Sequence, residues 1–551
     1  MREIFIVLCF FLFFSESLVA EDKPNIIFIL TDDQRYDMLG CTGNKLIQTP
    51  NIDKLAKEGT LFSNAHVTSA ICTPSRTSIL LSQFERKHGV NFNSGTSVAP
   101  EAWEKSYPVI LRQNGYYTGY IGKNHTPVGN EGYESGLMEK SFDYWYAGHK
   151  HLTFYPKTRH EIFKGAKSDT QVEIIGEGIQ DFLGNEHQIK EARYFLENRP
   201  NNKPFFLNIC FNLPHGAGTG SMKLLESDPE IYRTLYRDLN IPLPENYIAK
   251  SDIKTHKLPE SVHHFKDRQT GYNWVDAPNT VRERVIRQMQ TVTGIDRLIG
   301  ELRETLKANG LEKNTVIIFT SDHGLFSGEF GLGGKALCYE ICTHVPFIIY
   351  NPLVKESAGG QIVDELIQTI DIAPTLLAYA GIEIPDSYQG KTLNHIIEGE
   401  ITPVREYLFT ENLWSTPFGN PRCDAVQNKE WKYIRYNANN NISAIEIIKM
   451  AKDMGMRSDD LLYGVHDTEI AIYRNYVEAP FHGEEPIYEE LFNLKNDPNE
   501  TTNIAAEANY SQILKEMRRI WKLKIAFARG KDKPQVVRYT KDSQSQLVKA
   551  E

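Results

Sequence analysis

Short apolar runs recur along the chain, and patterns of helical period lie between them. Five runs are rich in Ile, Val, Phe and Tyr and are bounded by polar residues, Gly or Pro: NIIFIL, YYTGYI, PFFLNICF, TVIIFT and PFIIY, at residues 25–30, 116–121, 204–211, 315–320 and 346–350. Runs of this length and composition predict strands that are buried on both faces. We therefore expect an α/β fold with a large central, mostly parallel sheet flanked by helices.

A long amphipathic helix is predicted from Arg282 to Asn309, with Gly310 as its stop signal. Its apolar face comprises Val285, Met289, Val292, Ile295, Ile299, Leu302 and Leu306. We expect this helix to cover the sheet and to serve packing alone.

The pattern changes near residue 400. Residues 406–410, 431–436 and 489–493 predict short antiparallel strands, interrupted by a loop at 437–441, and a helix is expected from about 510 to 527. This is the pattern of a small α+β subdomain with a short antiparallel sheet. We expect a large domain over 21–400, the subdomain over 401–551, and a loosely ordered tail after Arg529.

The first 20 residues resemble a secretory signal peptide. Arg2 precedes an apolar run of 11 residues from Ile4 to Phe14, and Ser and Ala residues follow. A membrane span needs about 20 apolar residues, so this run is too short, and no later stretch is long enough. We expect an exported protein, periplasmic or secreted if bacterial, which we favour, and lysosomal or extracellular if eukaryotic.

Composition narrows the possible partners. A formal net charge of −10 over 551 residues argues against general binding of nucleic acid or anionic membranes. Only six cysteines lie beyond the leader, too few for a disulfide framework in a chain of this length. The sequence leaves open whether Cys338 and Cys342 pair or merely pack.

Charged clusters follow four of the predicted strands. They contain Asp32 and Asp33, Lys123 and His125, His215, and Asp322 and His323. Ligands of open α/β sheets bind beyond the carboxyl ends of the strands, so these clusters are expected to converge. Carboxylates with one imidazole suit a hard divalent cation, calcium or magnesium rather than zinc. Alternatively, the Asp pair could cap a helix.

Residues 71–76, ICTPSR, place a cysteine in front of a predicted helix. Pro74 favours the first turn of a helix, so Cys72 would lie at the helix N-terminus, where free backbone N–H groups attract anions. Arg76 follows one turn later and can bind the same anion with its guanidinium fork.

The segment Cys72-x-Pro74-Ser75-Arg76 resembles the maturation signature of the type I sulfatases, within the alkaline phosphatase superfamily. Further segments resemble that family in the same order: PNIIFILTDDQ, TPNIDKLAKEGTLFSNAH, GYIGKNH, SDHG, DIAPTLLAYAGIEIP and LFNLKNDPNETTNIA. The resemblance covers the mature chain and implies an alkaline-phosphatase-like fold, with residues 21–400 as the catalytic domain.

The resemblance implies specific roles for the clustered residues. Cys72 would be oxidised to formylglycine by a formylglycine-generating or sulfatase-maturating enzyme. One Ca²⁺ would be held by Asp32, Asp33, modified Cys72, Asp322 and His323; many family members have Asn in place of this histidine. The sulfate would be bound by Arg76, Lys123 and Lys335. The last of these lies in GLGGK, which lacks the spacing and the following Ser or Thr of a nucleotide-binding loop.

The implied reaction is hydrolysis of a sulfate ester, or of an N-sulfate. One hydroxyl of the hydrated aldehyde, activated by the metal and Asp33, attacks sulfur. His215, near Lys335, protonates the leaving group. His125 then removes a proton from the second hydroxyl, which expels sulfate and regenerates the aldehyde.

The sequence favours a sulfated glycan as substrate. The segment 144–151, YWYAGHKH, suits stacking on a sugar and pairing with an anion, or is an ordinary packed loop. His66, His88 and His344 are further candidates for the pocket wall. Two alternatives remain: a phosphonate or phosphodiester hydrolase with the same ligands, and a carbohydrate-binding pseudoenzyme with unmodified Cys72.

Overall fold

The computed structural model describes residues 23–538, except 93–95, 150–186, 220–225, 227–232, 263–269, 355–359, 401, 414–420, 439–448, 450–451, 453–476 and 532–535. Its centre is an eight-stranded sheet of order β12-β2-β11-β8-β1-β7-β5-β6. These strands are β1 (Asn25–Asp32), β2 (Thr60–Phe62), β5 (Tyr117–Asn124), β6 (Tyr144–His149), β7 (Phe205–Pro214), β8 (Thr315–Ser321), β11 (Phe347–Tyr350) and β12 (Gln361–Val363).

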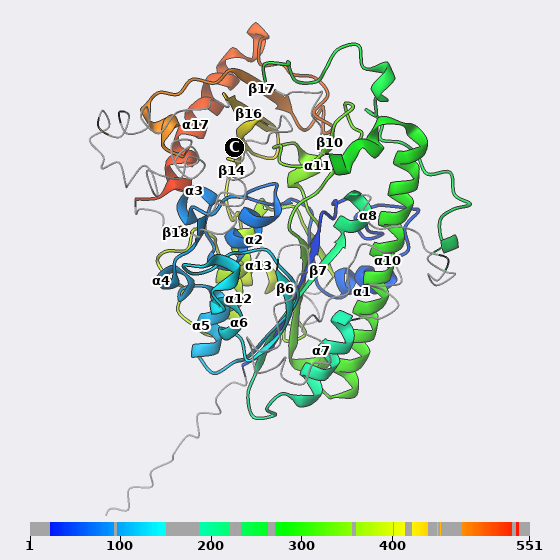
Figure 1. Ribbon diagram of the computed structural model, residues 1–551, viewed down its shortest axis with the longest axis vertical. Coiled ribbons are helices and arrows are strands. Elements are labelled where there is room, and N and C mark those ends of the chain that lie inside the picture. The colour runs from blue at the N-terminus through cyan, green and yellow to red at the C-terminus, as the bar shows by residue number, and fades with distance from the viewer. Residues whose placement is uncertain are drawn as a thin grey trace, which may run out of the picture.

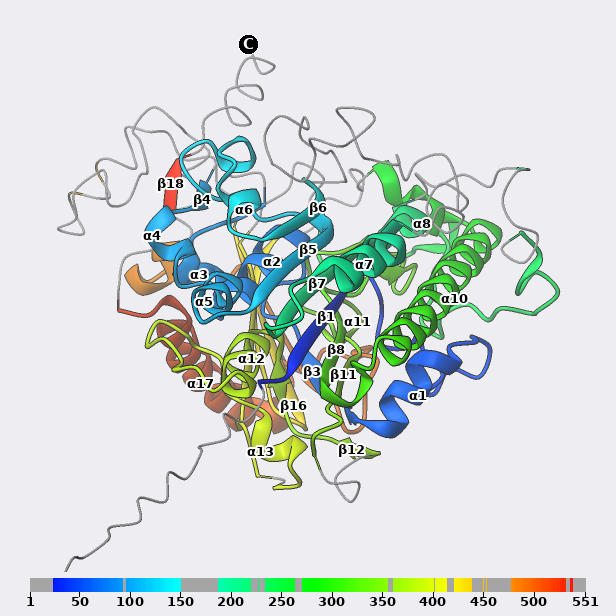
Figure 2. The same ribbon diagram turned by 90° about the horizontal axis from the view of Figure 1, so that it is seen from below.

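Helices cover both faces of this sheet, as the two views show (Figures 1 and 2). One face packs against α1 (Pro50–Glu58), α7 (His187–Asn198) and α10 (Pro278–Ala308); the other packs against α2 (Cys72–Leu81), α5 (Tyr107–Gln113) and α12 (Ile372–Tyr379). Successive side chains of a strand point to opposite faces. Accordingly, Ile27 and Ile29 of β1 belong to the first core and Ile26 and Phe28 to the second. Burial on both faces explains why the strands appear in the sequence as unbroken apolar runs.

The predicted class and its main elements are confirmed. All five predicted strands are present, and the sheet is mostly parallel, with β11 antiparallel to both β8 and β2. The expected amphipathic helix is α10, which runs along one side of the molecule in Figure 1 and buries most of its predicted apolar face. None of the described helices is both long and apolar enough to cross a membrane.

A four-stranded antiparallel sheet, of order β14-β15-β16-β17, forms the C-terminal part. It consists of β14 (Leu408–Asn412), β15 (Arg422–Gln427), β16 (Trp431–Asn437) and β17 (Tyr488–Asn493), and α17 (Ser511–Arg529) packs against it. Its apolar residues share clusters with residues of the large domain, such as Val67, Phe84 and Ile370. The core is therefore continuous across residue 400, and the boundary there stays a prediction.

Two sequence interpretations were wrong. The tail after Arg529 contains β18 (Val536–Arg538), which pairs with β4 (Thr96–Val98), so part of it is ordered by strand pairing. Residues 144–149 are not a loop but strand β6, parallel to β5. The ring of Trp145 is buried and stacks on Tyr120 at 5.1 Å, so it serves packing and not sugar binding. Residues 150 and 151 lie outside the described residues, as do the leader and most of the loop predicted at 437–441.

The remaining elements are short. They are β3 (Ala65–His66), α3 (Glu85–His88), α4 (Pro100–Trp103), α6 (Leu137–Lys140), α8 (His215–Thr219), β9 (Phe326–Ser327), β10 (Gly333–Gly334), α11 (Glu340–Thr343), β13 (Ile367–Gln368) and α13 (Asn394–Ile397), with 3₁₀ turns that include Thr270–Asp276.

Candidate active site

Cys72 is the first residue of α2 and lies among charged side chains. The preceding residue, Ile71, is extended, and all ten residues of the helix are buried. The Cys72 Sγ atom lies 3.1 Å from Lys335 Nζ, 3.2 Å from His323 Nε2 and 3.5 Å from Asp32 Oδ1. The helix N-terminus therefore presents Cys72 to both cations and carboxylates, as the sequence predicted.

Cys72 and three groups next to it can share a metal ion. Asp32, Asp33, Cys72 and His323 each offer one ligand atom, and these atoms all lie within 4.8 Å of one another. Asp32 ends β1, and the adjacent strand β8 ends at Ser321, in register with Thr31. Strand pairing therefore brings the acidic pair and His323 together across 290 residues of sequence.

Asp322, the fifth predicted ligand, also orders this cluster. Its Oδ1 accepts a hydrogen bond of 3.1 Å from the backbone N–H of Asp33, and its Oδ2 accepts one of 2.8 Å from Arg76 Nε. The first contact holds Asp33 in a left-handed conformation, with φ 65°. A non-glycine residue there is strained, and the strain turns its carboxylate toward Lys335 and His215.

Three buried cations surround the carboxylates. Arg76 NH2 lies 3.5 Å from Asp32 Oδ2, Lys123 Nζ donates to the same oxygen, and Lys335 Nζ donates to Asp33 Oδ1 at 2.8 Å. Burial alone would raise the pKa of Asp32, but Lys123 and Arg76 outweigh it and hold the pKa well below its usual range. The carboxylates are consequently ionised and able to ligate a cation.

The two predicted acid–base histidines differ in their surroundings. His215, at the start of α8, places Nδ1 2.7 Å from Asp33 Oδ2 and 3.4 Å from Lys335 Nζ. Burial lowers its pKa, with Lys335 adding to the effect and Asp33 opposing it. His125 follows β5 directly, is buried, and packs against Phe92 and Tyr133.

The donor set fits a hard divalent cation. Burial would lower the pKa of His323, yet Asp322 raises it to about 9, so the cluster attracts positive charge strongly. The adjacent Gln34 is fully buried, and within the described part of the chain neither atom of its amide group has a hydrogen-bond partner. A buried amide group usually has a partner. An ion in this cluster, or water bound to it, would supply both the charge and that partner.

Two residues of this region were missed by sequence reasoning. Gln34 follows the acidic pair directly, and its position could have suggested it. Tyr272 is buried and lies close enough to Lys335 to interact with it electrostatically. It sits in a 3₁₀ turn far from any recognised motif, so the sequence offered no signal.

The three additional histidines do not contact the catalytic cluster. His88 is buried, and its Nε2 lies 3.1 Å from Ser78 Oγ; burial lowers its pKa to about 3. His66 and His344 stack on each other at 4.9 Å, and Glu340 Oε2 lies 2.9 Å from His66 Nε2. His344 also lines a cavity.

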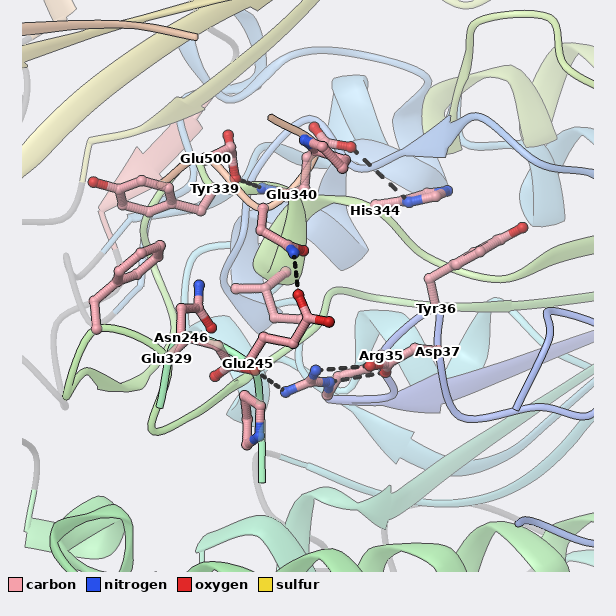
Figure 3. A pocket seen from close by; sticks show the side chains of 15 residues that line it. Arg35, Tyr36, Asp37, Glu245, Asn246, Glu329, Tyr339, Glu340, His344 and Glu500 are labelled. Carbon is pink, nitrogen blue, oxygen red and sulfur yellow. Dashed lines mark hydrogen bonds and ion pairs between the residues drawn. The ribbon is translucent and has the colours of Figure 1, made fainter. Parts of the chain in front are cut away.

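That cavity, of about 420 Å³, is distinct from the catalytic cluster (Figure 3). Its wall carries an ion pair between Arg35 and Asp37, a second between Arg35 and Glu329, and the ring of Tyr36 stacked on His344 at 3.8 Å. None of the predicted catalytic or metal-binding residues lines it.

Comparison with known proteins agrees with the class of protein that the sequence predicts. The sulfatase family model matches residues 24–382, and the model of the C-terminal region of N-sulphoglucosamine sulphohydrolase matches residues 328–472. The chain is 27% identical over 546 residues to an N-acetylglucosamine-6-O-sulfatase of Bacteroides thetaiotaomicron, covering 90% of this chain and 85% of that protein. It is 26% identical to an ulvan-active sulfatase of Formosa agariphila, covering 91% and 80%.

Solved structures share the fold. A protein solved in complex with its substrate D-glucosamine-2-N,6-O-disulfate superimposes with a TM-score of 0.65 at 22% identity, covering 93% of this chain and all of that one. The phosphonate monoester hydrolase of Agrobacterium radiobacter gives 0.64 at 18% identity, covering 91% and 95%. The fold is therefore the alkaline-phosphatase-like one.

The chain belongs to the sulfatase family, in its type I, formylglycine-dependent class. It is a sulfuric ester hydrolase, and its family implies both a formylglycine and a metal ion.

Proposed function

We propose that this enzyme removes sulfate from a sulfated carbohydrate, with a formylglycine made from Cys72 as nucleophile and one Ca²⁺ at the cluster of Asp32, Asp33, His323 and Asp322. The observation that carries this proposal is the position of Cys72 Sγ, within 3.5 Å of Lys335, His323 and Asp32 at a helix N-terminus. The oxygens of a formylglycine in its place would reach the metal ligands and the sulfate-binding cations together.

The modification and the ion would each supply one chemical capacity. A hydrated aldehyde offers one hydroxyl to attack sulfur and a second whose deprotonation releases sulfate, and a divalent cation lowers the pKa of a bound hydroxyl and polarises sulfate oxygens. All ten residues of α2 are buried. The maturating enzyme must therefore reach Cys72 before the chain has folded.

The chain's own cations bind and orient the sulfate. Arg76, Lys123 and Lys335 carry three positive charges, which balance the three carboxylates of Asp32, Asp33 and Asp322 in a formal count. A divalent cation would leave the pocket with a net charge of about +2. A chain of net charge −10 thus presents a cationic site to an anionic ester group.

Two histidines move the protons. Asp33 accepts from Nδ1 of His215, which directs Nε2 away from the carboxylate, where it can donate a proton to the departing oxygen or nitrogen. Burial lowers the pKa of His215, and Lys335 adds to this effect while Asp33 opposes it, which favours release of that proton from the imidazolium form. His125, on the adjacent strand end, takes up the proton that accompanies release of sulfate.

The substrate class rests on the relatives. The Bacteroides thetaiotaomicron and Formosa agariphila proteins are named for action on N-acetylglucosamine 6-sulfate and on ulvan, both sulfated carbohydrates. Together with the leader-like N-terminus, this supports an exported enzyme, periplasmic or secreted, that acts in glycan degradation on an ester sulfate or an N-sulfate.

Two measurements test the proposal. A tryptic peptide spanning Cys72, taken from native protein, should be lighter than the cysteine form by about 18 Da, and an ordinary thiol would refute the nucleophile. The protein should then release sulfate from sulfated glycan fragments much faster than it cleaves a phosphonate monoester, with Cys72→Ala inactive on both. The opposite preference would favour the phosphonate hydrolase.

A further inference from the structure

Two buried thiols from distant parts of the chain face each other. Cys338 Sγ lies 3.5 Å from Cys423 Sγ, across 85 residues of sequence. Cys338 is in the loop that follows Lys335, and Cys423 lies in β15 of the C-terminal sheet. Both are at most 1% exposed and belong to one hydrophobic cluster, with Ala425 and Phe492.

The pair differs from the one that sequence spacing suggested. Cys338 Sγ also makes weak contacts with two backbone oxygens, that of Cys423 at 3.8 Å and that of Thr410 at 3.9 Å. Cys342 lies four residues beyond Cys338, yet among the described residues no thiol lies within hydrogen-bonding distance of it. The fold therefore selects Cys423 as the neighbour of Cys338.

We propose that Cys338 and Cys423 form a disulfide in the exported enzyme. A disulfide has an S–S distance of about 2.05 Å, so the sulfurs have to approach by roughly 1.5 Å, within the reach of side-chain torsions. The two thiols lose two protons and two electrons to a protein disulfide donor, whose own disulfide leaves as a dithiol, and one S–S bond forms. This cross-link rests on the export proposed above.

The cross-link has to form during folding. In the folded chain both sulfurs are inaccessible to a protein donor, and burial raises the pKa of Cys338 well above its usual value, an effect that Cys423 adds to. Attack on a disulfide needs a thiolate. A chain that folds with both thiols reduced would therefore stay reduced, whereas a chain that meets a disulfide donor while folding would become cross-linked.

The consequence concerns the catalytic loop. Lys335 donates to Asp33 and contacts Cys72, and Cys338 lies only three residues further on. A bond to β15 ties this loop covalently to the C-terminal sheet. It also closes a loop of 85 residues, which restricts the unfolded chain and favours the folded state.

Peptide mapping of the full chain tests the cross-link. Exported protein is alkylated in denaturant without reductant, digested and analysed by mass. A linked peptide containing Cys338 and Cys423 is expected, with Cys41, Cys210 and Cys342 alkylated. Alkylation of all these cysteines, or a link from Cys338 to Cys342, would overturn the proposal.

Refolding separates this result from failure of export or of the sulfatase reaction. Reduced, denatured full chain is refolded with oxidised and reduced glutathione, and the linked peptide is expected to form without any leader processing or formylglycine. Reductant present during refolding should then lower the Tm of wild type and of the matched control Cys342→Ser by several degrees, but not that of Cys423→Ser. Equal Tm values with and without reductant in wild type would contradict a stabilising cross-link.

Discussion

Two buried groups of charges lie in this protein, and they are built differently. In the catalytic cluster, carboxylates, cations and imidazoles converge on one point beside Cys72, and four ligand atoms lie within 4.8 Å. In the second group, the Lys432 cluster (Lys432, Glu340, Glu500, His66 and His344), Lys432 Nζ lies between Glu340 Oε1 at 3.0 Å and Glu500 Oε1 at 2.8 Å.

The contrast distinguishes a reactive site from a structural one. The Lys432 cluster joins β16 to α11 and to the loop before α17, and its lysine is satisfied by the protein itself. The catalytic cluster raises the pKa of His323 to about 9, whereas burial lowers the pKa of His344 in the other cluster to about 4. The catalytic cluster therefore favours a positive charge on His323, whereas the Lys432 cluster keeps His344 neutral.

The largest effect is expected from Lys335→Ala. Lys335 is the cation nearest to Cys72 Sγ, at 3.1 Å, and would contact the sulfate during transfer. Loss of one such preorganised donor typically lowers the rate 10²–10³-fold, so we expect kcat/KM to fall by about 10³. The Tm should fall less than in a variant of Lys432, because His215 still donates to Asp33. Sulfate release and thermal unfolding measure the two effects. If Lys335→Ala lost stability but kept its activity per folded molecule, the role of Lys335 would be structural and not catalytic.

Lys432→Met should show the reverse pattern. It leaves the buried Glu500 and the partly buried Glu340 without their shared cation, and breaking a buried pair from one side costs about 3 kcal/mol or more. Urea unfolding should report this loss, while activity per folded molecule stays within about threefold of wild type, because the packing around Cys72 is unchanged.

Lys429→Met is the matched control on the hairpin between β15 and β16. Its lysine is 45% exposed and pairs with Asp364 and Glu365 at the surface, at 3.2 and 3.3 Å. Exposed pairs contribute about 1 kcal/mol or less. Similar losses in the free energy of unfolding for Lys432→Met and Lys429→Met would contradict the structural role given to Lys432.

The sequence predicted the catalytic cluster better than it predicted the C-terminal sheet, for a physical reason. Asp32, Lys123, His215 and Asp322 each follow an apolar run, so the sheet alone brings them to one edge. Strand β15, RCDAVQ, was missed because Arg422 and Asp424 look exposed in the sequence. Both are buried, since Asp424 pairs with Arg86 at 2.9 Å, a partner 338 residues away.

Strand β6 and the tail show the same limit. Residues 144–149 contain aromatic, glycine and histidine positions that suit either a loop or a strand, and pairing with β5 decides for a strand. Pairing of Val536–Arg538 with Thr96–Val98 likewise depends on a segment more than 400 residues earlier. The local pattern of apolar residues predicts strands that are buried on both faces. It fails where a strand forms only because a distant segment supplies its hydrogen bonds.

The affinity of the catalytic cluster for calcium should depend on pH. The pKa of His323 is about 9 in the absence of an ion, so binding below pH 9 must displace a proton. Affinity should therefore fall as the pH falls, by about 100-fold from pH 8 to pH 6, or roughly 2.7 kcal/mol.

Calorimetric titration of Ca²⁺ into chelator-treated enzyme at the two pH values measures this change, and chelation itself should abolish sulfate release until Ca²⁺ is restored. His323→Asn keeps an oxygen ligand and removes the titrating group, so its Ca²⁺ affinity should vary little over the same range. Equal affinities of the wild type for Ca²⁺ at pH 6 and pH 8 would show that Ca²⁺ binding does not displace a proton from His323.

The smallest effect concerns His344, the neutral counterpart of His323. Burial lowers its pKa from 6.5 to about 4, and Nε2 lies 2.9 Å from the carbonyl oxygen of Ser63. The unfolded chain therefore binds more protons than the folded one between these values, so the contribution of His344 to stability is complete above pH 6.5 and is lost as the pH falls toward 4. At pH 5 the loss should be about 1 to 2 kcal/mol, reduced by the 18% exposure of its side chain.

Urea unfolding of His344→Gln at pH 7 and pH 5 measures this loss. The free energy of unfolding of this variant should fall by about 1 to 2 kcal/mol less than that of wild type between the two pH values, whereas His395→Gln, in α13 outside the cluster, should behave as wild type. If His344→Gln showed the full wild-type loss, the acid sensitivity would come from other buried groups and not from protonation of His344.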